Sequence, residues 1–294
     1  MTSEKAKAFE QKKRQHVTDI AQRFLANFKN NPLASIRPYT ELERPVNFST
    51  AKEYRGQNVF TLNWAKRDKG FKWNSWVTFN QAKALDAGVR KGEKSTAIIG
   101  AISGVEGENQ VDRELSSKRQ VDFEVDKQGF VGFNLFNVFN VEQVEGLSLT
   151  DVAHPGANPF VRSVLDLDND IKSSPYEIVF GYSDISFDRA ERIIQYPSRA
   201  SFGVSDTGQN SSEFYSGIVT LVQLSRILDA SGEEMGKGNS PEAFLAALII
   251  AACKLQSASL SMSRSTLPEW LIEGIVSDSL NLSRVLRIVD TSLE

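Results

Sequence analysis

Apolar residues recur every three or four positions near both ends of the chain. A helix is predicted over residues 4–30, because one side of it collects the apolar residues Phe9, Val17, Ile20, Phe24 and Phe28. Thr78 followed by Gln81 has the spacing of a capping box, so a short helix is expected to begin there. Gly88 is placed to end that helix, since glycine adopts the left-handed conformation that closes many helices.

In the middle of the chain, residues 121–125 alternate between apolar and polar residues, which is typical of a strand. Strands are predicted at residues 96–101, 121–125 and 130–138. Residues 58–63 are also predicted to be extended, and the charged residues 66–70 are predicted to form a polar loop. We expect a small antiparallel sheet in this region.

The second half of the chain begins with a predicted loop-rich linker over residues 148–175. Short strands are expected near residues 177–180 and 192–195. Residues 214–228 place apolar side chains on one helical face. Residues 240–242 (Ser-Pro-Glu) combine a cap, a first-turn proline and a first-turn acid, and they predict the start of another helix.

These patterns predict an α+β protein in three parts. Residues 1–39 form an N-terminal helix or arm, residues 40–150 a mixed α/β domain with a small antiparallel sheet, and residues 151–294 a mostly helical, acidic domain. No run of about 18 apolar residues is present, so no membrane-spanning helix is expected. One cysteine, Cys253, and a charged N-terminus without an apolar core predict a cytoplasmic protein.

Charge is divided unevenly along the chain. Residues 1–147 carry 23 Lys and Arg against 18 Asp and Glu, whereas residues 148–294 carry 11 against 19. The net charges are therefore +5 and −8. Residues 44–94 alone carry 11 against 4, or +7. Such a window indicates either a localised site for a polyanion or a solvated charged face.

The same window is rich in aromatic residues. Eight lie between Phe48 and Phe79, among them three of the four tryptophans. Bases of any identity stack on aromatic rings while Lys and Arg contact the backbone, so this composition favours single-stranded nucleic acid. The alternative is that the rings fill a core. We expect Phe60 and Phe79 in the core, and Trp64, Phe71 and Trp73 beside the predicted 66–70 loop to be exposed for stacking.

Three segments of the window and its surroundings resemble a known domain. They are Tyr54-Arg55-Gly56-x-Asn58, the run Trp76 to Lys94, and Phe136-Asn137-Val138-Phe139-Asn140-x-x-Gln143. Their order and spacing resemble the ArdC-type N-terminal ssDNA-binding domain of plasmid anti-restriction proteins and conjugative primases. The resemblance covers roughly residues 40–147 and implies sequence-nonspecific binding of single-stranded DNA.

The candidate DNA-binding residues combine these motifs with the basic, aromatic window. We predict contacts from Tyr54, Arg55, Trp64, Lys66, Arg67, Lys69, Phe71, Lys72, Trp73, Arg90, Lys91 and Lys94. Within this set, Arg55, Lys91 and Lys94 suit contact with phosphate.

The resemblance also implies a second domain of zincin-like metallopeptidase type, in which H-E-x-x-H binds zinc. A loose alignment places Thr220, Leu221 and Leu224 at the His, Glu and His positions, so we expect a degenerate domain with no metal, no cofactor and no catalytic residues. The only histidines are His16 and His154. The acidic run Asp166 to Asp170 is read as a solvated linker rather than a calcium loop.

Three functions remain open. The overall layout resembles the Drc-type ssDNA-binding RNA polymerase cofactors of phages, which makes the leading prediction a non-catalytic ssDNA-binding protein. It would be phage-encoded, hold melted DNA open in the host cytoplasm, recruit an RNA polymerase and form a homo-oligomer. One alternative is an anti-restriction protein that protects incoming DNA. The other is an oligomeric scaffold that binds no nucleic acid.

Overall fold

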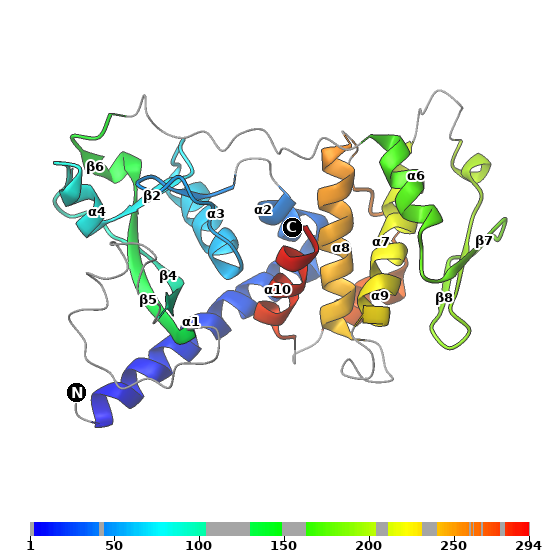
Figure 1. Cartoon of the computed structure of the whole chain (residues 1–294), viewed down its shortest axis with the longest axis horizontal. Helices are drawn as coiled ribbons and strands as arrows, with labels where there is room; N and C mark the ends of the chain where they lie inside the picture. The colour runs from blue at the N-terminus through cyan, green and yellow to red at the C-terminus, as the bar shows by residue number, and fades with distance from the viewer. Residues whose placement is uncertain are drawn as a thin grey trace. The chain divides into compact units, whose positions relative to one another are not determined.

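The computed structural model describes residues 3–40, 44–103, 130–148, 163–203, 211–230, 240–258, 260, 262–265, 267–276 and 280–293 (Figure 1). The chain divides into two compact units. The N-terminal unit comprises Met1–Gln22 and Glu43–Gly156, and the C-terminal unit comprises Arg23–Leu42 and Ala157–Glu294. The first helix, α1 (Ser3–Asn30), contributes to both units and confirms the helix predicted over residues 4–30.

The N-terminal unit is built around a small mixed sheet. Its described elements are β1 (Val46–Asn47), α3 (Gln57–Lys69), β2 (Ser75–Thr78), α4 (Phe79–Ala84), β3 (Gly88–Val89), β4 (Thr96–Ser103), β5 (Phe130–Asn140), the 3-10 turn η1 (Val141–Gln143) and β6 (Val144–Glu145). The larger sheet has the order β1-β2-β5-β4, and β3 pairs with β6 in a second one. The strands predicted at 96–101 and 130–138 are confirmed. The β1–β2 pair is parallel and the other pairs are antiparallel. The strand predicted at 121–125 lies outside the described residues.

Two apolar clusters cover opposite faces of the larger sheet, because successive strand residues point to opposite sides. Trp76 on β2 packs with Leu62 of α3 and with Ile98 and Val138 of the neighbouring strands. Its neighbour Val77 packs on the other face, together with Ala82 of α4. The indole N–H of Trp76 is satisfied within the core, where it donates to Asn74 at 3.1 Å.

The α3 helix corrects two predictions. Residues 58–63 were expected to be extended and residues 66–70 to be a loop, but both belong to one helix that ends at Gly70. Gly70 has a φ of 70°, the left-handed conformation that closes helices. Tertiary contacts override the strand propensity of this segment. Val59, Phe60 and Leu62 are all fully buried.

Asn58 gives a further reason for the helix. Its amide side chain donates to the carbonyl of Ile99 at 2.6 Å and accepts from the Ile99 N–H at 2.9 Å. Among the described strands β4 is the last in the order of the larger sheet, so its outward backbone groups need partners from other elements. Asn58 supplies them for Ile99 and thereby ties α3 to the sheet.

The capping box of α4 is confirmed, but the predicted end of that helix is wrong. Thr78 accepts from the Gln81 N–H and Gln81 accepts in return from the Thr78 N–H. The helix ends at Ala84, and the left-handed residue after it is Asp86, with a φ of 54°. Gly88 instead pairs with Glu145 as part of β3.

The C-terminal unit is mostly helical. Its described elements are α2 (Pro32–Thr40), α6 (Val164–Lys172), β7 (Glu177–Phe180), β8 (Ser186–Asp188), β9 (Ile193–Tyr196), the 3-10 turn η3 (Arg199–Phe202), α7 (Ser211–Ala230), α8 (Pro241–Ser257), α9 (Glu269–Ile275) and α10 (Leu282–Leu293). Helices α7 and α8 pack together, and α2, α9 and α10 contact α8. The predicted strands near 177–180 and 192–195 and the cap at Ser240 are confirmed.

The predicted linker over residues 148–175 is partly wrong, because α6 occupies its end. Ser163 and Asp166 form a capping box that starts this helix. Two apolar side chains of this helix, Leu167 and Ile171, are buried. Their burial explains why the segment forms a helix rather than an acidic loop. No described helix is long and apolar enough to cross a membrane.

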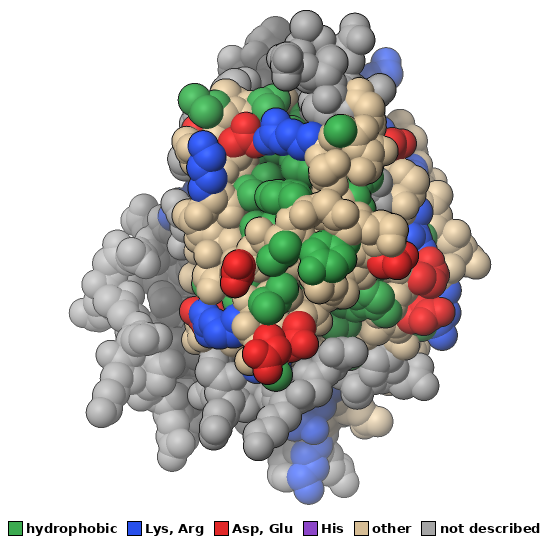
Figure 2. Space-filling model, turned by 90° about the vertical axis from the view of Figure 1, so that its right-hand side faces the viewer, with side chains coloured by type: hydrophobic (Ala, Val, Ile, Leu, Met, Phe, Trp, Pro, Cys, Tyr) green, Lys and Arg blue, Asp and Glu red, His purple; other side chains and the backbone are tan. Residues whose placement is uncertain are grey.

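The surface of the C-terminal unit carries apolar as well as charged side chains. Figure 2 shows the side of the molecule that lies at the right of Figure 1, with hydrophobic side chains gathered among acidic and basic ones. The exposed large hydrophobic residues of this unit include Val164, Leu165, Phe180 and Tyr182.

Candidate nucleic-acid interface

The last turn of α3 carries the first basic segment of the predicted site. Lys66, Arg67 and Lys69 all lie in this turn, where positive charge interacts favourably with the C-terminal end of the helix dipole. Arg67 and Lys69 are exposed, and Lys66 is half-buried. The ammonium group of Lys69 donates to the carbonyl of Lys94 at 2.9 Å, which joins α3 to a second basic segment.

The segment that follows α3 is held by residues from the end of β5. The backbone N–H groups of Lys72 and Trp73 both donate to Oε1 of Glu142, at 2.5 and 2.9 Å. Asn140 donates through its side-chain amide to the carbonyl of Trp73 at 2.8 Å. The backbone of Trp73 is therefore fixed at both its N–H and its carbonyl.

The second basic segment is the turn from Arg90 to Lys94. Gly92 has a φ of 91°, a conformation that residues with a side chain rarely adopt, so glycine is required for this turn. The side-chain amide of Gln143 donates to Glu93 at 2.8 Å and to the Lys94 carbonyl at 3.1 Å. The Arg90 N–H donates to the Gln143 carbonyl at 2.9 Å.

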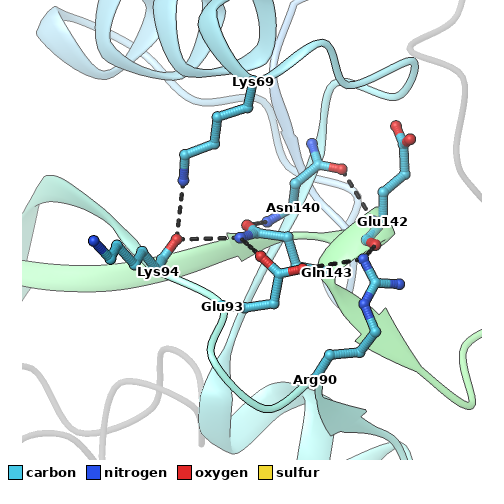
Figure 3. A network of polar contacts seen from close by, with 7 residues as sticks. All are labelled: Lys69, Arg90, Glu93, Lys94, Asn140, Glu142 and Gln143. Carbon is cyan, nitrogen blue, oxygen red and sulfur yellow. Dashed lines mark hydrogen bonds and ion pairs between the residues drawn. The ribbon is translucent and has the colours of Figure 1, made fainter.

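These contacts form one polar network, which consists of Lys69, Arg90, Glu93, Lys94, Asn140, Glu142 and Gln143 (Figure 3). The network brings together the Lys69–Trp73 and Arg90–Lys94 segments, which lie about twenty residues apart in the sequence. Arg90 connects two members of the network, because its guanidinium donates to the Glu142 carbonyl and pairs with Glu93 at 3.1 Å.

The charges of the network are arranged so that carboxylates contact backbone and arginine while lysine side chains stay at the surface. The hydrogen bonds from Gln143 and then Arg90 lower the pKa of Glu93, which keeps this carboxyl ionised. Lys72, Lys91 and Lys94 are exposed. Within the described ranges, none of their ammonium groups forms an ion pair.

The structure corrects the assignment of the aromatic residues. Trp64 was expected to be exposed, but it is only 4% exposed, because α3 turns it into the core beside Phe60 at a ring distance of 5.7 Å. Phe71 is half-buried with its edge against Trp76, and Trp73 is half-buried. Phe60 is buried as predicted. Phe79 was expected in the core and is 58% exposed, because it occupies the outward-facing first position of α4.

Tyr54 and Arg55 lie before α3 and do not belong to the network. Burial raises the pKa of Tyr54 to about 12, so its hydroxyl is neutral at physiological pH, and this hydroxyl accepts from Asn47 at 3.3 Å. Arg55 is exposed and precedes Gly56, whose φ of 59° forms the turn into α3. The contact of Arg55 with DNA stays a prediction.

Reasoning from the sequence missed the residues that hold the two basic segments together. Asn140 and Gln143 were noted only as part of a family pattern, and Glu142 was an unspecified position within it. Their spacing of three is that of a capping box, and the structure shows this box around η1. That spacing could have predicted the capping box. The contacts of these residues with distant segments of the chain depend on the fold.

The residues aligned with a zinc site do not fit a metal. Thr220, Leu221 and Leu224 are fully buried in α7, and the Thr220 hydroxyl donates to the Ser216 carbonyl at 2.7 Å. Leucine offers no ligand atom, and a threonine hydroxyl is a poor ligand for zinc. The described part of the chain contains no group of three or more His, Cys, Asp or Glu side chains arranged to hold a metal ion. His154 lies outside the described residues.

Comparison with known proteins relates part of the chain to a described domain family. Residues 14–139 match the family described as the N-terminal domain of anti-restriction factor ArdC. A 55-residue segment is 42% identical to a protein of Sinorhizobium fredii (strain NBRC 101917 / NGR234) called "Uncharacterized protein y4eC". That match covers 19% of this chain and 18% of the other protein, so it leaves most of both outside.

Solved structures of an ArdC protein share the fold over nearly the whole chain. The Mn(II)-bound crystal structure of the antirestriction ArdC protein from plasmid R388 superposes with a TM-score of 0.55 at 20% identity, covering 95% of this chain and 93% of that one. The metal-free structure of the same protein gives a TM-score of 0.51, also at 20% identity, over 94% of each chain. The fold is therefore the mixed α+β fold of that protein, with small sheets and a helical C-terminal region.

Proposed function

We propose that this chain, whose residues 14–139 match the ArdC N-terminal domain family, binds single-stranded DNA without catalysis and protects incoming DNA as an anti-restriction protein. The observation that carries the proposal is the polar network, which gathers two basic segments of a domain of this type into one surface. Lysine ammonium groups on that surface would contact phosphates, and Trp73 would receive a base.

The likeness to the ArdC protein of plasmid R388 favours anti-restriction over the two other predicted functions. Its name states that role, and its fold extends over both units of this chain. Recruitment of a phage RNA polymerase is the second candidate for the same DNA-binding surface. The scaffold interpretation relied on all the aromatic residues being core, and the exposure of Phe79 argues against that premise.

The C-terminal unit is proposed to be a degenerate relative of a zincin-like domain that has lost its metal site. The buried Thr220, Leu221 and Leu224 support this, since a metal would need ligands at such positions. In this proposal the unit contributes self-association or docking of a partner through apolar helix faces, and DNA binding needs no metal.

The proposal is tested by measuring the affinity of the full chain for a mixed-sequence single strand and for its duplex over a range of salt concentrations. We expect the single strand to bind more tightly, because base faces are hidden in a duplex, and we expect EDTA to change neither affinity. Trp73→Ala should weaken single-strand binding by about 1–3 kcal/mol and leave the salt slope unchanged. Equal affinity for both forms would contradict the stacking role.

A cellular assay separates the anti-restriction role from the polymerase role. When a restriction enzyme is present, cells that express the protein should be transformed by unmodified plasmid DNA more efficiently than cells that lack the protein. When the restriction enzyme is absent, the two kinds of cell should be transformed equally well. An effect that persists without the restriction enzyme would favour a role in transcription or replication instead.

A further inference from the structure

Glu142 is an acidic residue in the middle of a surface that we have assigned to a polyanion. One oxygen of its carboxylate, Oε1, accepts from the backbone N–H groups of Lys72 and Trp73 at 2.5 and 2.9 Å. Hydrogen bonds to an ionised acceptor are about twice as strong as neutral ones. A negative charge placed here needs an explanation, because it would repel a phosphate that approaches the same surface.

The position of Glu142 is itself fixed on both sides. Its N–H donates to Oδ1 of Asn140 at 3.0 Å, and its carbonyl accepts from the guanidinium of Arg90. Asn140 also holds the Trp73 carbonyl. Glu142 therefore contacts the Lys72–Trp73 segment through its carboxylate and Arg90 through its backbone carbonyl.

We propose that Glu142 is the positioning residue of the single-stranded-DNA surface. Resting on the function proposed above, the inference is that Glu142 fixes the backbone of Lys72 and Trp73 against the Arg90–Lys94 turn before DNA arrives. Without this anchor the two residues would have to be ordered on binding, and the loss of their conformational entropy would weaken the complex.

If Glu142 positions the backbone, its removal should change the affinity for DNA in the opposite direction from the removal of a repulsive charge. If Glu142 mattered only as a charge, removing it would strengthen binding to DNA. If it acts as an anchor, removing it weakens binding even though a repulsive charge disappears. The two effects can be separated by substitutions that change the charge and the reach of the side chain independently.

Three Glu142 variants of the full chain, with one control variant at Glu145, make this separation. Glu142→Gln removes the charge but keeps an oxygen at the same reach, so it should bind single-stranded DNA more tightly than variants that lose this reach. Glu142→Asp keeps the charge but is one methylene too short, and it should bind about tenfold more weakly than the unchanged protein, as should Glu142→Ala. Glu145→Ala removes an exposed acid from the adjoining strand β6 and should not weaken binding.

Amide hydrogen exchange provides a readout that does not depend on DNA. The backbone N–H groups of Lys72 and Trp73 should exchange faster in the Asp and Ala variants than in the unchanged protein, and the Gln variant should retain protection. Circular dichroism and thermal melting establish that each variant is folded. If Glu142→Ala fails to fold, the Asp and Gln variants still decide the question.

The outcomes are distinguishable. Faster exchange in Glu142→Asp with unchanged affinity for single-stranded DNA would overturn the positioning role and leave the proposed function intact. Tighter binding by Glu142→Ala would overturn it too, and would identify the carboxylate as a competitor of phosphate. Failure of the unchanged protein to bind single-stranded DNA would overturn the proposed function, and the positioning role with it.

Discussion

The two units use their charged side chains in different ways. In the N-terminal unit, Glu142 accepts from backbone N–H groups and Glu93 pairs with Arg90, while Lys72, Lys91 and Lys94 stay exposed. In the C-terminal unit, carboxylates form ion pairs with lysine and arginine side chains from other elements. Asp170 contacts Lys254 at 2.5 Å and Arg226 at 3.4 Å, and Asp168 pairs with Arg199.

The pairing of the charged side chains indicates where DNA could bind more directly than the net charges of +5 and −8 do. A positive charge already paired with a carboxylate offers little to a phosphate, whereas an exposed lysine without such a pair remains able to bind one. The C-terminal unit uses its ion pairs to link helices, since Asp170 lies on α6, Arg226 on α7 and Lys254 on α8. The described core clusters of the larger N-terminal sheet are apolar instead.

The largest expected effect is on stability, and it tests whether buried apolar side chains hold the N-terminal unit together. Trp64→Ala should lower the free energy of unfolding by about 3–5 kcal/mol, because it empties a buried site in α3. Urea unfolding followed by circular dichroism measures this. The matched control is Phe79→Ala, which truncates an exposed ring and should change stability by less than about 0.5 kcal/mol. Equal losses in the two variants would show that the burial of Trp64 does not support the fold.

The next effect tests the ionic links of the C-terminal unit. Asp170→Asn should destabilise the protein by about 3 kcal/mol, because it leaves the ammonium group of Lys254, which is 7% exposed, without its carboxylate. Lys254→Met removes the buried charge itself and leaves Asp170 with Arg226, so it should cost less. The same unfolding titration compares the two variants. A greater cost for Lys254→Met would contradict this account of the pair.

The smallest effect concerns DNA and tests whether the exposed lysines differ between the units. Lys91→Ala should reduce the slope of log affinity against log salt by about 0.7 for single-stranded DNA, since one phosphate contact is lost. Lys172→Ala removes an exposed lysine from the end of α6 and should leave the slope unchanged. Similar slopes in the two variants would mean that the basic surface has been placed in the wrong unit.

Local sequence patterns were sufficient for elements whose signals are contained within a few residues. The capping boxes at Thr78 and the cap at Ser240 are confirmed, because a cap depends on side chains three positions apart. The long amphipathic α1 is confirmed for a similar reason, since its apolar residues recur with the period of a helix.

By itself, the sequence determined the α+β class, the basic and acidic halves and the resemblance to the ArdC-type domain. Only the tertiary structure decided that Gln57–Lys69 forms α3, that Trp64 is buried and Phe79 exposed, and that Asn140, Glu142 and Gln143 join two basic segments. The physical reason is that burial and hydrogen-bond partners are set by residues distant in the chain. Asn58, for example, is paired with Ile99, and Glu142 with Lys72, and no local period or spacing encodes such a pair.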